Sequence, residues 1–415
     1  MTRARARRRA KQIRLIAVLS VILIALIGVA VFGFGDQSGW STDGGVTRYL
    51  DSKGNPQSGW QKIDGKDYYF NPNGGAMVTG WQEIEGDKFY FTAEGVLCYE
   101  WLELDGNRYY LGKNGVMTTG WKELNGKLYY FDQDGRAGTG TLELDGKHYR
   151  FNEDGSAVTG WYEDATGRYY YDETGAGYTG WLEWEQKTYY LNENGAVTTG
   201  WMTVGADRYY FLPTGRMAIG EVEVDGISRF FSSKGKEVLM CNPWHAIPED
   251  FKLDLVDYEG FQFDRVAKPY LEQMFNDGRA AGVSLEVNNS YRSIATQQYK
   301  WDRKVAERMA QGMTKEEAER ITGQSLAIPG HSEHHTGLAL DINSGGGSYE
   351  WMDEHCWDYG FILRYPDNHL DITGIIYEPW HFRYVGLELA QELKNYCCME
   401  EYFAELTEQQ KNILD

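Results

Sequence analysis

Proline, cysteine and positive charge are all scarce in this sequence of 415 residues. Nine prolines, set against 49 glycines and 30 tyrosines, exclude a collagen-like or proline-rich chain and favour many short strands and turns. The five cysteines are too few for a disulfide-based scaffold, and none is spaced as Cys-x-x-Cys. We expect them to be mainly small, buried apolar residues.

Basic residues are outnumbered by acidic ones and are concentrated at the start of the chain. The net charge is −20, and residues 1–14 hold seven of the 41 basic residues and no acidic one. The rest of the chain therefore carries a net charge of −27, which would be repelled by nucleic acid phosphates. We expect no nucleic acid partner.

An apolar, charge-free run over residues 15–34 follows the basic segment. As a helix, a run of this length spans about 30 Å, the thickness of a bilayer core. The positive flank is expected to stay in the cytoplasm. The sequence thus predicts a cytoplasmic segment (1–14), a single transmembrane anchor (15–34) and an extracellular remainder at the cell wall. A cleaved signal peptide is the alternative, because Gly28-Val29-Ala30 offers small residues for cleavage.

A repeat of about twenty residues occupies residues 37–240. Most units contain Gly-Trp, an aromatic pair further along and then a turn glycine. The repeated tryptophans are Trp40, Trp60, Trp81, Trp101, Trp121, Trp161, Trp181 and Trp201, and Thr141 and Glu221 stand where a tryptophan is missing. Units this short cannot bury a core alone but can do so when stacked. We expect an all-β solenoid of hairpins, with turns such as Asp64-Gly65.

These units resemble the cell-wall-binding repeats of Gram-positive surface proteins, of the choline-binding and glucan-binding type. In choline-binding repeats an aromatic cage holds the quaternary ammonium group, and a tryptophan usually precedes the tyrosine pair. Here that position holds other residues, among them Asp67, Arg108 and Thr188, so one wall of the cage is missing. A choline-bearing polymer, a glycan and a plain spacer remain open. Stacked tryptophan and tyrosine would also serve the core of a solenoid without any ligand.

The remaining residues, 241–415, lack the repeat and contain seven of the eight histidines. Their pattern alternates helix and strand and predicts an α+β domain. We expect helices over 269–281 and 293–311 and strands over 338–342 and 372–377. Thr314 with Glu317 is typical of a capped helix start.

Three candidate metal ligands lie in two short clusters of this domain. His334 and Asp341 are in the first cluster, residues 332–341, and His381 is in the second, residues 377–381. A catalytic zinc ion takes about three nitrogen or oxygen ligands from the protein and keeps one position open for water. On spacing alone, a zinc site and a purely structural His–Asp pair are equally acceptable interpretations.

A glutamate stands beside the last of these ligands. Glu378 precedes His381 by three residues, with Pro379 between them. The proline argues against a helix, so we expect this pair on a loop or at a strand end. A carboxylate held beside a metal without binding it can take the proton of the metal-bound water.

Further segments connect these clusters to a known family. They include Cys241-Asn242-Pro243-Trp244, Ser290-Tyr291-Arg292-Ser293 with Gln297, residues 332–341, residues 360–366 and Glu378-Pro379-Trp380-His381. Together they resemble the VanY-type D-alanyl-D-alanine carboxypeptidases, zinc peptidases that trim peptidoglycan stem peptides.

The resemblance implies a role for each candidate residue. His334, Asp341 and His381 would bind Zn²⁺, and Glu378 would be the catalytic base. Arg292 would bind the substrate and assist catalysis, and Ser332 and Gln297 would help to hold the substrate end. His335, although adjacent to a ligand, is not expected to bind zinc.

The implied function is removal of the terminal D-alanine from stem peptides by an anchored extracellular enzyme whose repeats bind or span the cell wall. The zinc motif is equally compatible with an L,D-carboxypeptidase or a peptidoglycan endopeptidase. A non-catalytic wall-binding protein is a further alternative.

Overall fold

The computed structural model describes residues 37–343 and 345–412. The predicted cytoplasmic segment and transmembrane anchor, residues 1–34, lie outside this range. Across the described residues, no helix is both long and apolar enough to cross a membrane. Contacts divide the chain into two compact units, one with residues 37–160 and 173–176, the other with residues 161–172 and 177–412.

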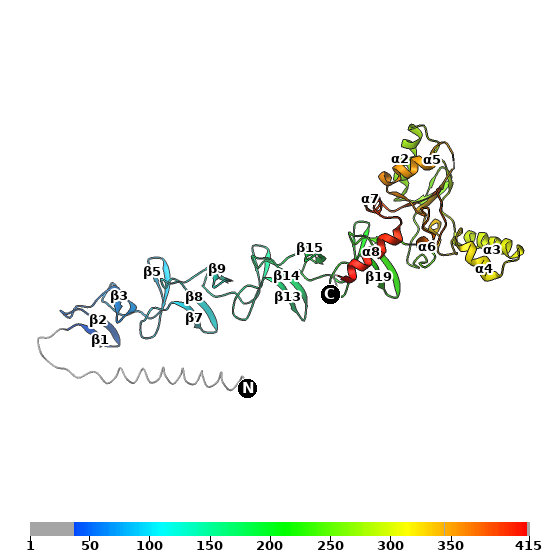
Figure 1. Ribbon diagram of the computed structural model, residues 1–415. Helices are drawn as coiled ribbons and strands as arrows, with labels where there is room; N and C mark the ends of the chain where they lie inside the picture. Colours follow the sequence, from blue (N-terminus) through cyan, green and yellow to red (C-terminus); the bar gives the residue numbers. More distant parts are fainter. Residues whose placement is uncertain (1–36, 344, 413–415) are drawn as a thin grey trace. The chain divides into compact units, whose positions relative to one another are not determined.

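The repeat region consists of short antiparallel hairpins, as the sequence predicted (Figure 1). Strands β1 to β20 pair in consecutive twos, and a short strand, β21, adds to the last pair. Their bounds are β1 Gly39–Asp43, β2 Val46–Leu50, β3 Gly59–Ile63, β4 Lys66–Phe70, β5 Gly80–Ile84, β6 Asp87–Phe91, β7 Glu100–Leu104, β8 Asn107–Leu111, β9 Gly120–Leu124, β10 Lys127–Phe131, β11 Gly140–Leu144, β12 Lys147–Phe151, β13 Gly160–Asp164, β14 Gly167–Tyr171, β15 Gly180–Trp184, β16 Lys187–Leu191, β17 Gly200–Val204, β18 Asp207–Phe211, β19 Gly220–Val224, β20 Ile227–Phe231 and β21 Glu237–Val238.

One hairpin illustrates why the sequence folds this way. Asp64 and Gly65 have φ angles of 47° and 78°, and positive values at both central residues define the tight turn that matches strand twist. The turn sets the register that places Trp60 opposite Tyr69. Phe70 is fully buried, and its ring lies 5.9 Å from that of Trp40 in the preceding hairpin. Each hairpin thus completes its core with a neighbour, as expected for stacked repeats.

The last hairpin, β19–β20, shares its core with the C-terminal helix α8 (Met399–Asn412), which lies against β19 in Figure 1. Phe230 packs edge-on against Phe403 with ring centroids 5.2 Å apart. The backbone N–H of Glu221 donates to Thr407 Oγ1 at 2.7 Å. Gly220 faces the helix so closely that a Cβ atom would stand 2.5 Å from the backbone nitrogen of Thr407. The last repeat is therefore packed as part of the C-terminal domain.

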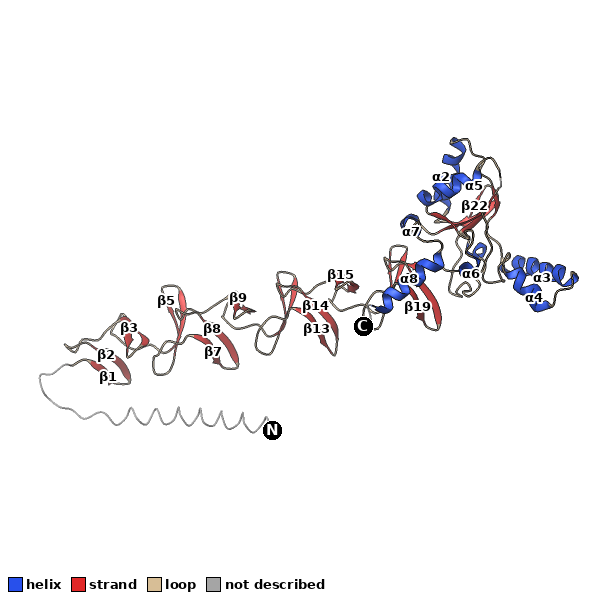
Figure 2. Ribbon diagram, in the orientation of Figure 1, coloured by secondary structure: helices blue, strands red, loops and turns tan. Residues whose placement is uncertain are grey.

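The helices that the structure describes lie in the C-terminal domain (Figure 2). Its elements, besides α8, are β22 Leu255–Tyr258, β23 Phe261–Asp264, α2 Lys268–Ala280, β24 Val287–Asn289, α3 Ile294–Ala310, α4 Lys315–Gly323, the 3₁₀ helix η1 Glu333–Thr336, β25 Ala339–Ile342, α5 Ser348–His355, the 3₁₀ helix η2 Cys356–Tyr359, β26 Phe361–Leu363, α6 Leu370–Thr373, β27 His381–Tyr384 and α7 Leu387–Leu393.

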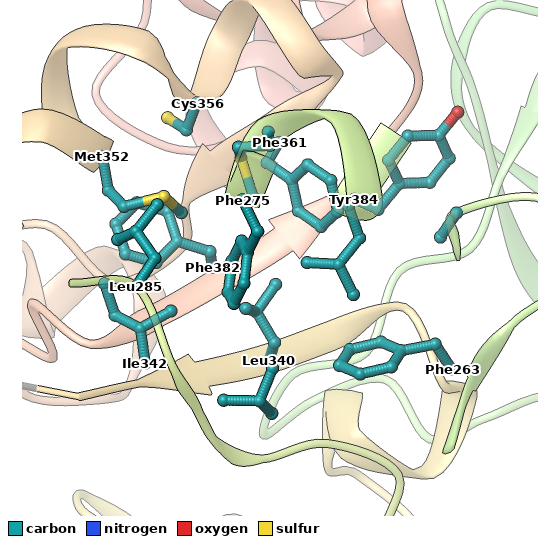
Figure 3. Packing of buried hydrophobic residues seen from close by; sticks show 14 of the residues in the cluster. Phe263, Phe275, Leu285, Leu340, Ile342, Met352, Cys356, Phe361, Phe382 and Tyr384 are labelled. Carbon is teal, nitrogen blue, oxygen red and sulfur yellow. The ribbon is translucent and has the colours of Figure 1, made fainter. Parts of the chain in front are cut away.

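A four-stranded antiparallel sheet with the order β24-β25-β27-β26 forms the centre of this domain. Leu340 on β25 and Phe382 on β27 are cross-strand partners, and both are buried in the apolar core together with Phe275 and Met352 from α2 and α5 (Figure 3). Because successive side chains of a strand point to opposite faces, the residues next to Leu340 and Phe382 face away from this core.

The predicted α+β class and most helices are confirmed by the structure. Helices α2 and α3 match the predicted ranges to within a residue or two, and the Thr314 side chain accepts a hydrogen bond from the N–H of Glu317 at the start of α4. The strand predicted over 372–377 is wrong, because α6 ends there and irregular chain follows. Gly374, in the left-handed region at φ 73°, terminates that short helix.

Candidate metal centre and active site

The sheet brings two of the candidate ligands together. Asp341 on β25 and His381 on β27 are direct cross-strand partners, and both face away from the apolar core. Asp341 Oδ1 lies 3.1 Å from His381 Nδ1. Asn289 on β24 is the partner of Asp341 on its other side, and its amide donates to Asp341 Oδ2 at 2.9 Å. Adjacent strands therefore form one polar row across the sheet.

The third candidate ligand comes from the short helix η1 that precedes β25. Gly337, in the left-handed region at φ 74°, ends η1, and the chain then enters the sheet. His334 Nδ1 lies 2.8 Å from the carbonyl oxygen of Ser290 and donates to it, which leaves Nε2 without a proton. That Nε2 atom is 3.3 Å from Asp341 Oδ2. The hydrogen bond to the Ser290 carbonyl thus orients the His334 ring so that its Nε2 faces Asp341.

These three residues suit a zinc ion. One donor atom from each of His334, Asp341 and His381 lies within 4.8 Å of the others. Asp341 Oδ1 is buried and has no hydrogen-bond partner among the described residues, as expected of an atom reserved for a metal. Two imidazoles and one carboxylate are a ligand set typical of catalytic zinc, which keeps a further position for water.

A buried glutamate that the sequence analysis missed lies behind the site. Glu333 Oε2 is 3.6 Å from His381 Nε2, on the side of the ring away from Asp341. Its other oxygen, Oε1, pairs with Arg364 Nε at 2.8 Å and Arg383 NH1 at 3.0 Å. Burial alone would raise the pKa of Glu333, but the two guanidinium groups outweigh burial and hold that pKa below its ordinary value. A permanent negative charge therefore faces the ring.

The buried charges continue toward the C-terminal helix. Arg364 binds both carboxylate oxygens of Glu400 on α8, at 2.9 and 2.6 Å. Arg364 and Glu333 side chains are completely buried. The sequence gives no signal that these residues interact, because they are far apart along the chain and only the fold brings their charges together.

Glu378 lies in the loop before β27, as the proline beside it predicted. Its backbone N–H donates to the carbonyl of Tyr365 at 3.1 Å, which fixes the loop. Its Oε2 atom is 3.7 Å from His381 Nδ1. Burial raises the pKa of the Glu378 carboxyl to about 7, with the His381 ring opposing the shift. A carboxyl with this pKa can both accept and donate a proton near neutral pH.

Arg292 and Gln297 act as a pair. Gln297 is fully buried near the start of α3, where its Oε1 accepts from Arg292 NH1 at 2.7 Å and its amide donates to the carbonyl of Ala327. Arg292 Nε is buried with no hydrogen-bond partner in the described part of the chain. Gln297 thus holds a guanidinium that retains an unused donor, and it does not itself line the pocket.

A pocket of about 200 Å³ joins these groups. The predicted site residues in its wall are Arg292, Ser332, His334, Asp341, Glu378 and His381. Leu326, Ile375 and Trp380 add apolar surface, and the Tyr365 ring packs against that of His381 in a tilted arrangement, with ring centroids 4.9 Å apart. The pocket therefore combines a metal-ligand set, a carboxylate and a guanidinium.

His335 points away from this pocket. Its Nδ1 donates to the carbonyl of Arg292 at 2.6 Å, and its Nε2 accepts from the backbone N–H of Gly330 at 3.2 Å. Both ring nitrogens are thus engaged with backbone. This arrangement agrees with the expectation that His335 has no metal-binding role.

Comparison with known proteins identifies both parts of the chain. The family model described as D-alanyl-D-alanine carboxypeptidase, VanY, matches residues 261–387. The choline-binding repeat model matches residues 37–79, 78–119 and 118–157, and a model described as a putative cell wall binding repeat matches residues 179–197.

Curated relatives agree with these matches. A D-alanyl-D-alanine carboxypeptidase of Enterococcus faecalis is 39% identical over 173 residues, covering 40% of this chain and 65% of that protein. The putative carboxypeptidase YodJ of Bacillus subtilis is 33% identical over 205 residues, covering 44% of this chain and 71% of that protein. A solved structure of a mutant of the vancomycin resistance D,D-pentapeptidase VanY, in complex with Zn(II), is 38% identical with a TM-score of 0.38, covering 40% of this chain and 97% of that one.

The C-terminal domain thus defines a peptidase of the D-alanyl-D-alanine carboxypeptidase class. The chain belongs to the VanY family of D-alanyl-D-alanine carboxypeptidases, and it carries choline-binding-type repeats before the peptidase domain. The family, the enzyme class and the zinc cofactor expected from the sequence are confirmed. The chain spans just under two thirds of the length of the E. faecalis relative.

Proposed function

We propose that this protein is a zinc D,D-carboxypeptidase that removes the terminal D-alanine from peptidoglycan stem peptides at the cell surface. The observation that carries the proposal is the meeting of His334, Asp341 and His381 with Glu378 and Arg292 in one pocket. This combination provides a metal site, a base and a cation for a carboxylate, which are the needs of a carboxypeptidase.

The metal ligands and Glu378 have different roles in the proposed reaction. Zinc bound by the two histidines and Asp341 supplies a Lewis acid that lowers the pKa of water toward about 7. Glu378 accepts a proton from the attacking water and later donates it to the leaving amine of D-alanine. Its position in a loop fixed by the Tyr365 carbonyl keeps it beside the ligands without joining them.

Arg292 provides the positive charge for the substrate. Its free Nε donor and its place in the pocket wall suit the terminal carboxylate of a stem peptide or the oxyanion that develops during attack. Gln297 is not part of the pocket wall and keeps the guanidinium in place by accepting a hydrogen bond from it. Ser332 belongs to the same wall and helps to hold the substrate end.

Defined stem peptides test the bond preference. We expect release of D-alanine from a pentapeptide ending in D-Ala-D-Ala, and little release from the tetrapeptide that an L,D-carboxypeptidase would cut. Preference for the tetrapeptide, or cleavage within a cross-link, would contradict the D,D assignment. Absence of all peptidase activity in zinc-loaded protein would favour a non-catalytic wall-binding role.

The location of the enzyme in the cell depends on its N-terminal residues and its repeats. We propose that residues 15–34 anchor the chain in the cell membrane, that residues 1–14 stay in the cytoplasm, and that the repeats bind or span the wall. The charge-free apolar run behind a basic flank supports the anchor. Extraction from membranes by detergent but not by salt would support it, and recovery of a chain shortened after residue 30 would indicate cleavage.

A further inference from the structure

A second hollow adjoins the catalytic pocket. Its volume is about 590 Å³, compared with about 200 Å³ for the catalytic pocket. Helices α3 and α4, which lie side by side in Figure 2, form part of its wall, and irregular chain forms the rest. None of its lining residues belongs to the metal site, the base or the Arg292–Gln297 pair. We call this hollow the α3–α4 groove, and its main lining residues are Pro243, Trp301, Arg320, Gln324 and Ile328.

The groove and the catalytic pocket share two walls. In the first wall, Gln324 and Ile328 border the groove, whereas residues 325–327 between them border the catalytic pocket. In the second wall, Gly374 borders the groove and its neighbour Ile375 borders the pocket. Consecutive Cα atoms are about 3.8 Å apart, so a single thickness of chain separates the two hollows. A substrate too long for the catalytic pocket can therefore continue into the groove.

The first shared wall is fixed by hydrogen bonds to its backbone. The carbonyl of Gln324 accepts from the N–H of Ile376 at 2.8 Å. Further along the wall, the carbonyl of Ala327 accepts from the side-chain amide of Gln297, the residue that also holds Arg292. Each contact ties the wall to a different part of the domain. The groove is therefore preformed, as ligand pockets usually are.

Two tryptophans offer aromatic surface in and beside the groove. A Cβ atom at Gly323 would stand 3.7 Å from the outer edge of the Trp301 ring, so this glycine leaves that part of the ring uncovered. At Gly374, a Cβ atom would stand 2.7 Å from Pro243 and 3.4 Å from the Trp244 ring, which places both residues at the second shared wall. Trp244 is 57% exposed. Exposed aromatic rings beside a hollow are typical of binding surfaces.

Trp244 is held by its backbone although its side chain is exposed. The side-chain oxygen of the buried Asn242 accepts from the N–H of Trp244 at 3.1 Å, and the amide of Asn242 donates to Glu400 at 3.0 Å. Both residues belong to Cys241-Asn242-Pro243-Trp244, a segment of the family resemblance that contributes no residue to the wall of the catalytic pocket. The structure thus gives this segment a place beside the groove.

Polar groups without partners lie next to this aromatic surface. Arg320 is exposed and Gln324 is partly exposed, and neither side chain forms an ion pair or hydrogen bond with the residues that the structure describes. A sugar ring fits this combination, because it has an apolar C–H face and a rim of hydroxyl and acetamido groups. An extended peptide commonly binds along a strand edge, and none of the groove's lining residues lies in a strand.

We propose that the α3–α4 groove binds a sugar ring of the glycan strand that carries the stem peptide. In peptidoglycan the amino end of a stem peptide is joined to the glycan strand. The four residues before the scissile bond of a pentapeptide span at most about 14 Å, and the groove begins at the wall of the catalytic pocket. This inference rests on the proposed D,D-carboxypeptidase activity and adds the sugar part to its substrate.

Two substrates with the same scissile bond test the proposal. One is the free pentapeptide ending in D-Ala-D-Ala, and the other is that pentapeptide joined to the disaccharide N-acetylglucosaminyl-N-acetylmuramic acid. We expect the zinc-loaded full-length chain to cleave the second with a kcat/KM higher by about 3- to 10-fold, because packing on one aromatic ring contributes about this factor. Equal values for the two substrates would overturn the proposal.

Variants test whether the preference arises in the groove. Trp301→Ala removes an aromatic face, and Arg320→Ala removes an exposed donor at little risk to the fold. We expect each to bring the ratio of the two kcat/KM values toward one. Tyr299→Ala is the matched control and should keep the ratio, because Tyr299 is a 66% exposed ring on α3 that does not line the groove. A preference that persists in both groove variants would contradict the sugar site.

A third substrate distinguishes a sugar from a longer peptide. It is the pentapeptide extended at its amino end by two amino acid residues instead of the disaccharide. We expect its kcat/KM to match that of the free pentapeptide. A preference for the extended peptide that Trp301→Ala removes would show that the groove binds peptide, and the sugar assignment would be wrong.

Binding of the disaccharide alone gives a readout that does not depend on catalysis. Saturation-transfer NMR compares the disaccharide with the full-length chain and with Trp301→Ala, and we expect a weaker signal with the variant. Equal signals would overturn the proposal whether or not D-alanine is released. The expected difference in signal, without D-alanine release from any substrate, would contradict the proposed function and support the sugar site.

Discussion

Asp341 and His381 face each other as direct partners in neighbouring strands, with Oδ1 of one 3.1 Å from Nδ1 of the other. Sheet register therefore sets the geometry of two metal ligands. Leu340 and Phe382, the adjacent pair, point into the core on the other face. Because a slip of one residue exchanges the faces of a strand, burial of Leu340 and Phe382 keeps Asp341 and His381 in the site.

Glu378→Gln tests the assignment of the base. The amide cannot accept the proton of the attacking water, so we expect kcat for D-alanine release to fall by about 10²- to 10⁴-fold. Bound zinc, measured by atomic absorption, should remain at one ion per chain because Glu378 is not a ligand. Glu354→Gln, at a side chain 78% exposed, is the matched control and should keep full activity. Full turnover in the Glu378 variant would refute the role.

Glu333→Gln tests whether the buried carboxylate positions His381. A neutral amide no longer offers a full negative charge to Nε2, and partners behind metal-binding histidines typically contribute 10- to 100-fold in affinity. We expect zinc affinity to fall by about that factor. The variant also deprives the buried guanidinium groups of Arg364 and Arg383 of the negative charge of Glu333, so the free energy of unfolding should fall by about 3–5 kcal/mol.

Glu400→Gln separates these two effects. Glu400 pairs with the same Arg364 and does not contact His381. Its loss should lower stability in thermal unfolding while zinc affinity, measured by competition with a chelator, stays near that of the original chain. Equal loss of zinc affinity in both variants would show that Glu333 acts only through stability.

His334→Ala and His335→Ala form a test between adjacent residues. The first removes a ligand, so zinc content and activity should both be lost. The second breaks two hydrogen bonds to backbone and should cost about 1–3 kcal/mol of stability while zinc content is unchanged. Loss of zinc from folded His335→Ala protein would show that the ligand set is wrong.

Gln297→Ala tests whether Gln297 positions the guanidinium group of Arg292. The substitution removes a hydrogen bond to a charged group, worth about 1.5–3 kcal/mol, and frees the guanidinium. We expect KM for the pentapeptide to rise about tenfold or more, with a smaller change in kcat. Gln298→Ala is the control, because the Gln298 amide donates to Asp302 one turn along the exposed helix surface and not to Arg292. A kcat loss without a KM change would contradict the proposed role.

The sequence predicted the repeat region well, because its signals are local. The Asp64-Gly65 turn and the spacing of Trp60 from Tyr69 specify a hairpin within a few residues. The strand predicted over 372–377 failed for the opposite reason. Its β-branched residues favour a strand, but Gly374 and a short helix before it take the chain around the pocket instead.

The candidate site was predictable where residues lie in motifs and not where they meet only in space. His334 and Asp341 share one short segment, and Glu378 and His381 another. Glu333 is adjacent to His334, yet its importance depends on Arg364 and Arg383, which reach it only after the sheet forms. Asn289 directly precedes the Ser-Tyr-Arg motif, and only the pairing of β24 with β25 brings it to Asp341.

Metal-dependent release of D-alanine tests the central claim most directly. The full-length chain is stripped of metal with a chelator, and D-alanine release from a D-Ala-D-Ala-terminated pentapeptide is followed before and after addition of one equivalent of zinc, with Asp341→Asn alongside. We predict no release from the stripped chain, recovery with zinc, and neither zinc binding nor recovery in the variant. Release by the stripped chain, or full zinc-dependent activity in Asp341→Asn, would contradict a metal centre built from His334, Asp341 and His381.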